Sequence, residues 1–482
     1  MTDEKMHKFD LIVIGGGSGG LTMAAVSAQL GYKVALLEGG KMGGDCLNYG
    51  CVPSKSLISA AKKVHTAQEA GAQFGLTLKG KADMAAVHKH IHNTIKTIAP
   101  HDSQERFESL GVTVYREYGF FINDNTVGTE GGKRLKAKRI VIATGSRPFT
   151  PPINGLIGSG FYTNETIFDL KETPEHLLIA GGGPIGVEMA QAFVRLGSEV
   201  TLIEGGPQIL GPEDTDVAQS VEETLQQEGV NIIKQHMLSH VNKEGADKYT
   251  LTLSKNGHLK TIKGTALLVA LGRQPNIEKL ELENAGIETN GRFIKTDKNL
   301  RTTNKNIFAV GDVAGNYQFT HMAGYEAAHV VKRVLFGAFW SKVSYHAVPW
   351  CTYIEPEVAT VGLNEKSAKA KFGQIAVKTT KTYFSANDRA QAENKTHGFI
   401  KLNTVKGKPV GVTIYGPSAG ELIGLWTLIL HKKLPLSAAS GMIHPYPTLN
   451  DISRQVVSDY YKPVFHSKKV RFISHMMYRL FG

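Results

Sequence analysis

The residues best suited to chemistry are two cysteines near the start of the chain. Cys46 and Cys51 lie within residues 43–55, which read Gly-Gly-Asp-Cys-Leu-Asn-Tyr-Gly-Cys-Val-Pro-Ser-Lys. Two thiols separated by four residues can come together around one helical turn, so a disulfide between them can open and close with little backbone movement. Closing so short a loop removes little entropy from the unfolded chain, which argues against a purely structural disulfide. The pair therefore predicts redox chemistry.

The composition indicates a large enzyme rather than a small secreted domain. A chain of 482 residues is too long for one hydrophobic core and predicts about three domains. It contains only three cysteines, which suits a reducing compartment, and we interpret the third, Cys351, as a core thiol. No apolar stretch reaches the ~20 residues that span a bilayer, and residues 1–10 lack the organisation of a signal peptide, so we expect a cytoplasmic protein. The net charge of +12 is dispersed and no nucleic-acid-binding module is present, so we expect no nucleic-acid partner.

A glycine-rich unit begins close to the start of the chain. It consists of an apolar strand, a glycine turn, a helix, a second strand and an acid, at residues 9–14, Gly15-Gly16-Gly17-Ser18-Gly19-Gly20, 21–30, 33–37 and Glu38. In such a unit Gly15 permits the turn, Gly17 lets the backbone approach a pyrophosphate, and Gly20 allows close packing of the helix. The helix N-terminus would hold the phosphates, and Glu38 would accept hydrogen bonds from ribose hydroxyls.

The same unit occurs a second time. It has strands at residues 177–180 and 199–203, the glycines Gly181, Gly183 and Gly186, a helix that runs to residue 196, and the acid Glu204. The first glycine and the acid are 23 residues apart in both copies (204−181 and 38−15). Two complete units predict two bound dinucleotides in an α/β fold with two Rossmann-like domains. Glu204 suits a free 2′-hydroxyl, and residues 205–214 contain no Arg or Lys for a 2′-phosphate, which favours NADH over NADPH.

The cysteine segment, placed after the first unit, resembles the redox-active segment of the flavin-dependent pyridine nucleotide-disulfide oxidoreductases. This family includes lipoamide dehydrogenase, glutathione reductase and mercuric reductase. The resemblance implies FAD in the first unit and NADH in the second. It also implies that Cys51 is the flavin-proximal, charge-transfer thiol and that Cys46 is the interchange thiol that attacks substrate. Lys55 would lie beside the flavin and pair with Glu188.

Three further segments resemble the cofactor sites of the same family. They are residues 141–148 with Thr144 and Gly145, residues 268–276 with Gly272 and Arg273, and residues 307–312 with Gly311 and Asp312. The resemblance implies that Asp312 binds the ribityl chain of FAD and that Met322 and Ala323 pass near the flavin pyrimidine. Without that resemblance, Asp312 would be interpreted as a helix cap after a strand.

The resemblance also implies a division of the chain into domains. We expect an FAD-binding domain in two parts, residues 1–150 and 286–345, which flank an NAD-binding domain at residues 151–285. Residues 346–482 resemble the family's α+β dimerisation domain, which implies a homodimer whose active sites are completed by the partner subunit. The basic and apolar tail at residues 462–482 could lie on an anionic membrane surface, but such tails more often pack on their own domain, and we expect packing here.

The C-terminal domain departs from lipoamide dehydrogenase at its catalytic base. That enzyme has a His directly before Pro-Thr and a Glu five residues after the His. This chain has Tyr446 before Pro-Thr, with Asp451 five residues later. Tyrosine is a poor base at neutral pH because its reference pKa is about 10. His444 is an alternative base, although that alignment places Leu449 where the carboxylate belongs.

The segment from Phe384 to Ala390, together with Tyr446, looks more like mercuric reductase, yet no cysteine follows Cys351 to form that enzyme's C-terminal pair. We therefore predict an enzyme that passes electrons from NADH through flavin to the Cys46–Cys51 disulfide and on to a disulfide, metal ion, quinone or other electrophile. No resident metal site is assigned. One alternative is a dihydrolipoyl dehydrogenase with a displaced base; another is a non-catalytic binding or scaffold protein that retains the fold.

Overall fold

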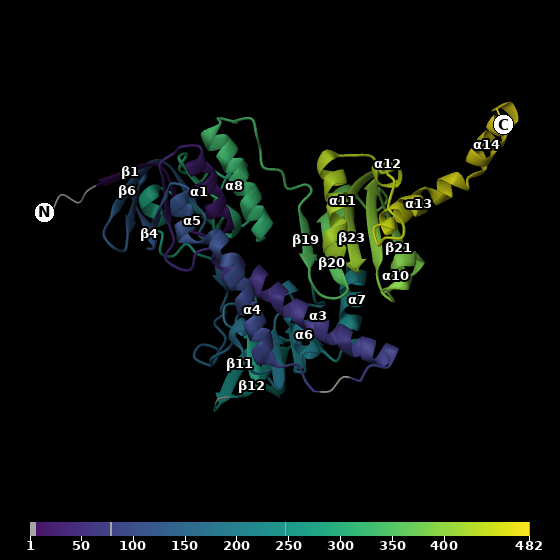
Figure 1. Cartoon of the computed structure of the whole chain (residues 1–482), viewed down its shortest axis with the longest axis horizontal. Helices are drawn as coiled ribbons and strands as arrows, with labels where there is room; N and C mark the ends of the chain where they lie inside the picture. The colour runs from purple at the N-terminus through teal and green to yellow at the C-terminus, as the bar shows by residue number, and fades with distance from the viewer. Residues whose placement is uncertain (1–5, 78–79, 246, 482) are drawn as a thin grey trace. The chain divides into compact units, whose positions relative to one another are not determined.

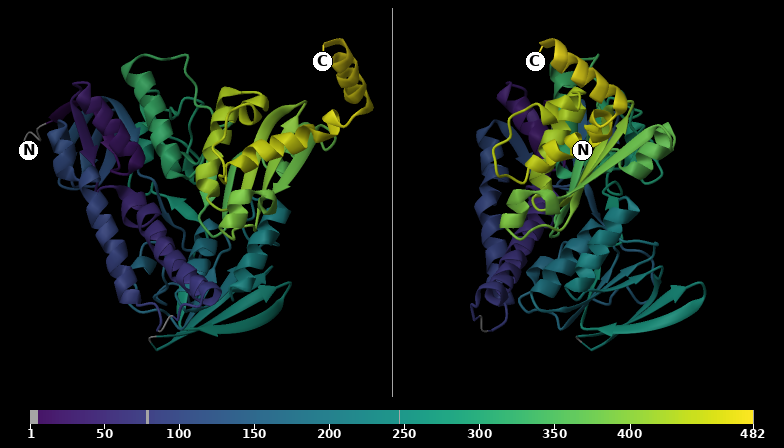
Figure 2. Two further views of the ribbon diagram at one scale, coloured as in Figure 1. Left: turned by 45° about the vertical axis from the view of Figure 1, so that its right-hand side comes forward. Right: turned by 90° about the vertical axis from the view of Figure 1, so that its right-hand side faces the viewer.

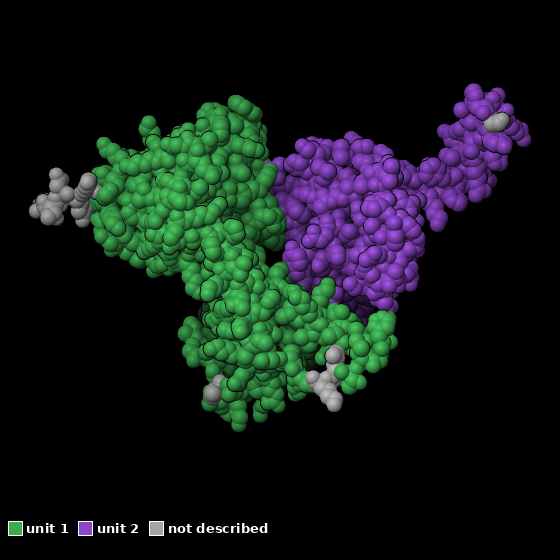
Figure 3. Space-filling model, viewed as in Figure 1, with its two compact units in different colours: residues 1–205, 229–343 green, residues 206–228, 344–482 purple. Residues whose placement is uncertain are grey.

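The structure is a computed structural model that describes residues 6–77, 80–245 and 247–481. The first five residues, on which part of the interpretation of the N-terminus rested, lie outside the described residues. The chain forms two compact units, residues 1–205 with 229–343, and residues 206–228 with 344–482 (Figure 3). The finer domain boundaries drawn from the sequence stay a prediction. Among the described helices, none has the length and apolar character needed to cross a bilayer.

The larger sheet of the first unit carries the first glycine-rich turn. Its order is β3-β2-β1-β6-β5-β4, with β18 also paired to β6. The strands are β1 (Met6–Ile14), β2 (Val34–Leu37), β3 (Val112–Tyr115), β4 (Gly119–Asn123), β5 (Thr126–Thr129), β6 (Arg134–Ile142) and β18 (Ile307–Ala309). Parallel pairing sets Ile14 opposite both Leu37 and Ile142, so the turn after β1 and the acid after β2 lie at one edge of the sheet. Helices α1 (Ser18–Gln29) and α8 (Thr320–Leu335) lie side by side on this sheet (Figure 1).

The second glycine-rich turn belongs to a separate parallel sheet of order β10-β9-β8-β14. Its strands are β8 (His176–Ala180), β9 (Glu199–Glu204), β10 (Asn231–Lys234) and β14 (Ala266–Val269), and helix α6 (Pro184–Arg195) follows β8. An antiparallel sheet of β11 (Met237–Glu244), β12 (Lys248–Lys255) and β13 (His258–Gly264) projects from the same part of the unit (Figure 2). Short strands β7 (Ser146–Pro148) and β15 (Arg273–Pro275) pair with each other. Both expected βαβ units therefore form, each on its own sheet.

The second unit is built on the antiparallel sheet β19-β20-β23-β22-β21. These strands are β19 (Pro349–Thr352), β20 (Glu357–Gly362), β21 (Val377–Tyr383), β22 (Phe399–Val405) and β23 (Lys408–Gly416). Helices α11 (Ala419–Lys432) and α13 (Asp451–Phe465) pack on it around the buried Trp426, whose Nε1 donates to Ser453 Oγ at 3.1 Å. Cys351 is half-buried on β19 against this core, as expected of a core thiol.

A cluster of charged side chains is buried inside the second unit. The Lys401 side chain on β22 is only 2% exposed, and its ammonium group lies 2.9 Å from Asp214, 2.8 Å from Asp216 and 2.9 Å from Glu365. Although desolvation opposes it, hydrogen bonding to these carboxylates raises the pKa of Lys401 above its usual range. Asp214 and Asp216 lie at the start of helix α7 (Thr215–Gln227), so this cluster joins residues 206–228 to the sheet.

The chain ends in helix α14 (Lys468–Phe481), which follows α13. The expectation that the tail packs on its own domain is wrong for this helix, because none of its side chains is buried. The sheet already carries α11 and α13, and the chain turns away after Phe465, so the apolar side chains of Phe472, Met476 and Leu480 remain exposed. Figure 2 shows α14 standing away from the sheet of its own unit.

Candidate active site

The first glycine-rich turn is built so closely that only glycine fits. Gly15 has φ +112°, and a Cβ there would lie 2.3 Å from the carbonyl oxygen of Ala143. A Cβ on Gly20 would lie 1.8 Å from the carbonyl oxygen of Gly15. Glu38 at the end of β2 accepts hydrogen bonds of 2.6 Å from the backbone N–H groups of Gly16 and Gly40. These hydrogen bonds fix the Glu38 carboxylate beside the glycine-rich turn.

The second turn makes the same contacts as the first, at nearly the same distances. Gly181 has φ +113° and would place a Cβ 2.4 Å from the carbonyl oxygen of Ala270, and a Cβ on Gly186 would lie 1.9 Å from that of Gly181. Glu204 accepts the N–H of Gly182 at 2.8 Å. Equal sequence spacing has thus produced equal geometry.

Both turns have room for a phosphate group. A Cβ on Gly17 would approach only the Cα of Gly44, at 3.8 Å, and one on Gly183 would meet nothing within 4 Å. Each turn leads directly into a helix N-terminus, α1 or α6. At each turn, the close backbone contacts, the open space at Gly17 or Gly183 and the fixed carboxylate fit one bound dinucleotide.

The two redox cysteines come from two helices rather than one. Cys46 lies in α2 (Gly44–Asn48), whereas Cys51 is the first residue of α3 (Cys51–Phe74). The single helical turn expected from their spacing is wrong because the chain leaves helical geometry at Gly50, which has φ −119° and ψ −107°. A Cβ on Gly50 would lie 2.7 Å from a carboxylate oxygen of Asp45. The break places Cys51 at a helix N-terminus, where the helix dipole favours a thiolate.

The two free thiols have opposite acid–base behaviour. A hydrogen bond from Cys46 is the main cause that lowers the pKa of Cys51 to about 6, against the opposing effect of burial. The hydroxyl of Thr320, 3.3 Å from the Cys51 sulfur, and the charge of Lys55 act in the same direction. The hydrogen bond to Cys51 and burial together raise the pKa of Cys46. Cys51 is therefore the thiolate of the pair, and Cys46 is the protonated donor.

The structure brings Lys55 and Glu188 together, as the resemblance implied. The Lys55 ammonium group on α3 lies 2.7 Å from a carboxylate oxygen of Glu188 on α6, and the two side chains are 36% and 7% exposed. One turn of α3 separates Lys55 from Cys51, so the cation lies on the side of the thiolate. Lys55 is thus held by Glu188 of the second glycine-rich unit. Its positive charge lowers the pKa of Cys51, which follows the first unit.

Asp312 is embedded in a polar cluster assembled from distant segments. Burial raises its pKa, and a hydrogen bond from the Ser146 hydroxyl opposes that rise. The guanidinium group of Arg273 donates to the same hydroxyl at 2.7 Å and lies 3.0 Å from Asp45. Arg273, expected at the nicotinamide site, therefore contacts the cysteine segment and Asp312. Sequence reasoning did not identify Asp45 or Ser146, whose roles depend on these long-range contacts.

The other expected flavin-site residues lie where β6, β14 and β18 end. Gly145, Gly272 and Gly311 have positive φ angles of 66°, 108° and 73°, and the Thr144 hydroxyl donates to the carbonyl of Asn276 at 2.7 Å. Met322 and Ala323 form the first turn of α8, beside Gly311. The Gly311 N–H donates to the fully buried Glu326 at 2.7 Å. Glu326 was missed from the sequence; an acid on the apolar face of a helix was the available signal.

The candidate base region of the second unit differs from the sequence pairing. The Tyr446 hydroxyl donates to Asp388 at 2.7 Å, and this hydrogen bond raises the pKa of Tyr446. Asp451 instead accepts from Arg454 at 2.7 Å. His444 Nε2 donates to the carbonyl of Ala439 at 2.8 Å. At neutral pH Tyr446 therefore forms the phenolate, the form that could act as a base, even less readily than free tyrosine. Its carboxylate partner is Asp388.

Comparison with known proteins finds matches over most of the chain. The family model described as pyridine nucleotide-disulphide oxidoreductase matches residues 9–327, and the model for the dimerisation domain of that family matches residues 348–456. A dihydrolipoyl dehydrogenase of Geobacillus stearothermophilus is 34% identical over 453 residues, which cover 92% of this chain and 95% of the relative. A mercuric reductase of Lysinibacillus sphaericus is 33% identical over 446 residues, which cover 92% of this chain and 80% of that enzyme.

Among solved structures, the chain is similar to the Cu(II) complex of RclA, an HOCl-induced flavoprotein disulfide reductase from Escherichia coli. The TM-score is 0.84 at 28% sequence identity, and the match covers 94% of this chain and 99% of RclA. The similarity therefore extends over both units.

Proposed function

Because the chain belongs to the pyridine nucleotide-disulphide oxidoreductase family, we propose that its Cys46–Cys51 couple carries electrons from NADH to a small acceptor outside the protein. The chain is a flavoprotein oxidoreductase with an FAD-binding oxidoreductase domain and a dimerisation domain, and its family uses FAD and a nicotinamide nucleotide. The observation that carries the proposal is the split pair of thiols, with Cys51 held as a thiolate between Cys46, Thr320 and Lys55.

The residues divide the work as follows. FAD held at the first glycine-rich turn by Gly15, Gly17, Gly20 and Glu38 would supply two-electron chemistry between NADH and the Cys46–Cys51 disulfide. Cys51 keeps the negative charge, since Lys55 and Thr320 stabilise its thiolate. Cys46 keeps the proton and reacts with the acceptor once it is deprotonated. Glu188 positions Lys55 through their 2.7 Å ion pair.

NADH is the favoured nucleotide, held at the second turn by Gly181, Gly183 and Gly186. Glu204 is the basis for this preference, because its carboxylate is fixed by the N–H of Gly182 and would repel a 2′-phosphate. Substitution of Glu204 with Gln is expected to raise the KM for NADH about tenfold or more, since a charge-assisted hydrogen bond is worth ~1.5–3 kcal/mol. The KM for NADPH should fall or stay unchanged. Steady-state kinetics with both nucleotides measure the difference.

For the acceptor, we favour a soft metal ion. Thiolates bind such ions directly, whereas exchange with a disulfide substrate needs a base to deprotonate Cys46, and Tyr446 is poorly suited to that task. Two relatives point the same way: one is named mercuric reductase, and RclA was solved as a Cu(II) complex. One NADH would reduce two Cu(II) ions to Cu(I), or one Hg(II) to Hg(0), with release of one proton in each case.

Dihydrolipoyl dehydrogenase activity is the second candidate, and the 34% identical relative supports it. It requires a base near the interchange thiol. His444 is the alternative to Tyr446, although its Nε2 is engaged by the carbonyl of Ala439. In either case we infer a cytoplasmic homodimer in which Tyr446, Asp451 and His444 of the dimerisation domain act on the partner subunit's dithiol.

Anaerobic assays of the purified holoenzyme distinguish the two candidates. We expect NADH oxidation that depends on Cu(II) or Hg(II) and is lost in Cys46→Ala, with little NAD reduction by dihydrolipoamide. Fast dihydrolipoamide turnover that is lost in His444→Ala would instead establish the second candidate. If NADH reduces the protein but neither substrate class accelerates turnover, the metal-ion proposal is wrong and quinones or other disulfides become the acceptors to test.

A further inference from the structure

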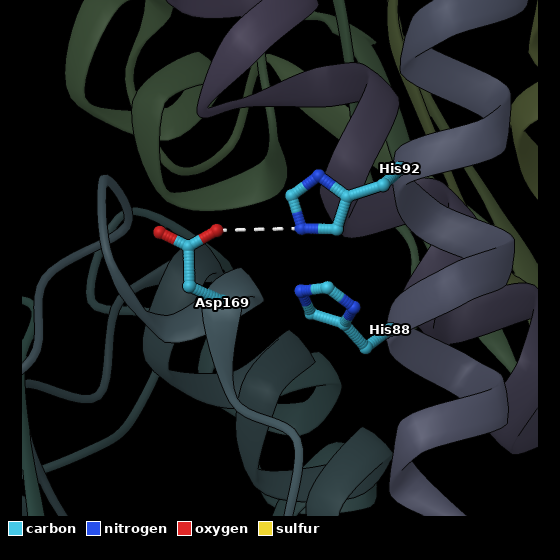
Figure 4. A group of neighbouring side chains, drawn as sticks. All are labelled: His88, His92 and Asp169. Atoms are coloured by element: carbon cyan, nitrogen blue, oxygen red, sulfur yellow. Dashed lines mark ion pairs between the residues drawn. The ribbon is translucent and has the colours of Figure 1, made fainter.

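Two histidines and a carboxylate gather at one place outside the redox site. His88 and His92 lie four residues apart on α4 (Met84–Ile98), with ring centroids 4.1 Å apart. Asp169, the last residue of the short helix η2 (Ile167–Asp169), faces them, with 3.3 Å between its Oδ1 and His92 Nε2. Each residue offers one ligand atom, and these three atoms lie within 4.8 Å of one another. Figure 4 shows the two rings and the carboxylate directed toward a common space.

The backbone holds the three groups in place. On α4, Met84, Val87 and Ile91 are buried, and His88 and His92 lie half-buried at the margin of that face. Ile167 and Phe168 are also buried and leave Asp169 exposed at the end of η2. The three ligand atoms, which lie within 4.8 Å of one another, must therefore converge only by small side-chain movements to reach the ~2.0–2.2 Å bond lengths of a zinc site.

A simple ion pair between His92 and Asp169 does not account for the whole group. The Nε2 atom of His92 is shielded from solvent, yet it makes no hydrogen bond in the described structure. His88 approaches the same ring, although two histidines that both carry a proton would repel each other.

We propose that His88, His92 and Asp169 bind one divalent cation of the zinc type. Two imidazole nitrogens and one carboxylate oxygen, without a thiolate, suit Zn²⁺ and its borderline neighbours rather than Ca²⁺ or Mg²⁺. Three protein ligands leave a coordination position for water. Lys171, near His88, opposes the cation, so the site should bind more weakly than a closed four-ligand site. The bound ion would join α4 to the segment that precedes β8.

The test uses the full-length holoenzyme without an affinity tag and with Cys46 and Cys51 oxidised, so that the dithiol does not compete for metal. Calorimetric titration with Zn²⁺ compares the wild type with His88→Gln, His92→Gln and Asp169→Asn. The matched control is His90→Gln, an exposed histidine on the same helix. We expect one site in the wild type and in the control, and at least a tenfold loss of affinity in each of the other three variants. Co²⁺ should give visible absorption typical of nitrogen and oxygen ligands only.

A second measurement needs no variant. Zn²⁺ should protect His88 and His92, but not His90, from modification by diethylpyrocarbonate, as read by peptide mass spectrometry of the wild type. The proposal is overturned if zinc protects the three histidines equally, or if His90→Gln weakens binding as much as His88→Gln. It is also overturned if the wild type binds Zn²⁺ no more tightly than the His88→Gln/His92→Gln double variant. Each of these results would indicate nonspecific binding to surface histidines.

Discussion

The hydrogen bond from Cys46 to Cys51 allows the sharpest test, because its removal should change the acidity of the remaining thiol. With the pKa of Cys51 lowered to about 6, about 90% of this thiol is ionised at pH 7. The hydrogen bond from Cys46 is the largest cause of the lowering, ahead of Thr320 and Lys55. In Cys46→Ala we therefore expect the pKa of Cys51 to rise by at least one pH unit, which leaves about half or less of the thiol ionised at pH 7.

The matched control is Cys46→Ser, which keeps a hydrogen-bond donor at the same position. The proposed function places Cys51 as a lone thiol beside oxidised FAD in both variants, so its thiolate should give a long-wavelength absorbance that can be titrated between pH 4 and 10. The absorbance should be lost as the pH falls through the pKa, at a higher pH in Cys46→Ala than in Cys46→Ser. Equal midpoints in the two variants would refute the assigned hydrogen bond. The pH dependence of iodoacetamide alkylation of Cys51 provides an independent measure of the same pKa.

Three other predictions concern cofactor placement, buried charge and the tail. Gly20→Ala should yield colourless protein that lacks FAD, whereas Gly186→Ala should yield yellow protein that NADH does not bleach. The reason is that the added Cβ atoms would lie 1.8 and 1.9 Å from backbone oxygens. The reverse pattern would contradict the assignment of the two turns. Lys401→Met should destabilise the second unit by about 3–5 kcal/mol, since three carboxylates lose their buried partner; thermal unfolding measures this against exposed Lys408→Met, and equal midpoints would argue against the buried cluster. Full-length protein should co-sediment with anionic lipid vesicles more than a chain ending at residue 467, because α14 exposes apolar side chains beside four basic residues and no acid; equal co-sedimentation would exclude a membrane role for α14.

Local patterns in the sequence predicted the parts of the site that depend on short-range geometry. The spacing of Gly15, Gly20 and Glu38 was sufficient to predict a strand, turn, helix and acid, because the contacts of Gly20 with Gly15 and of Glu38 with Gly16 lie within one βαβ unit. The repeat at Gly181 predicted its near-identical copy for the same reason. Lys55 and Glu188 were paired only through the family resemblance, since 133 residues separate them.

The remaining contacts could not be predicted because they arise from tertiary packing. Thr320 reaches Cys51 across 269 residues, and Tyr446 finds Asp388 rather than the acid near it in sequence. The helix break between the cysteines was missed although it depends on local sequence, and Gly50, which ends one helix and precedes the next, was the available signal. The His88–His92 pair was visible as an i, i+4 motif, but Asp169 comes from a segment whose approach to α4 no sequence pattern indicated.

The most direct test of the central claim is to count thiols as NADH is added. Under anaerobic conditions, oxidised holoenzyme is mixed with one equivalent of NADH, quenched with an alkylating reagent and analysed by peptide mass spectrometry. The proposed electron path predicts that Cys46 and Cys51 become alkylated together in an NADH-dependent manner, while Cys351 does not change. If NADH bleaches the flavin but leaves Cys46 and Cys51 in their oxidised form, electrons do not pass through this pair and the proposed function is wrong.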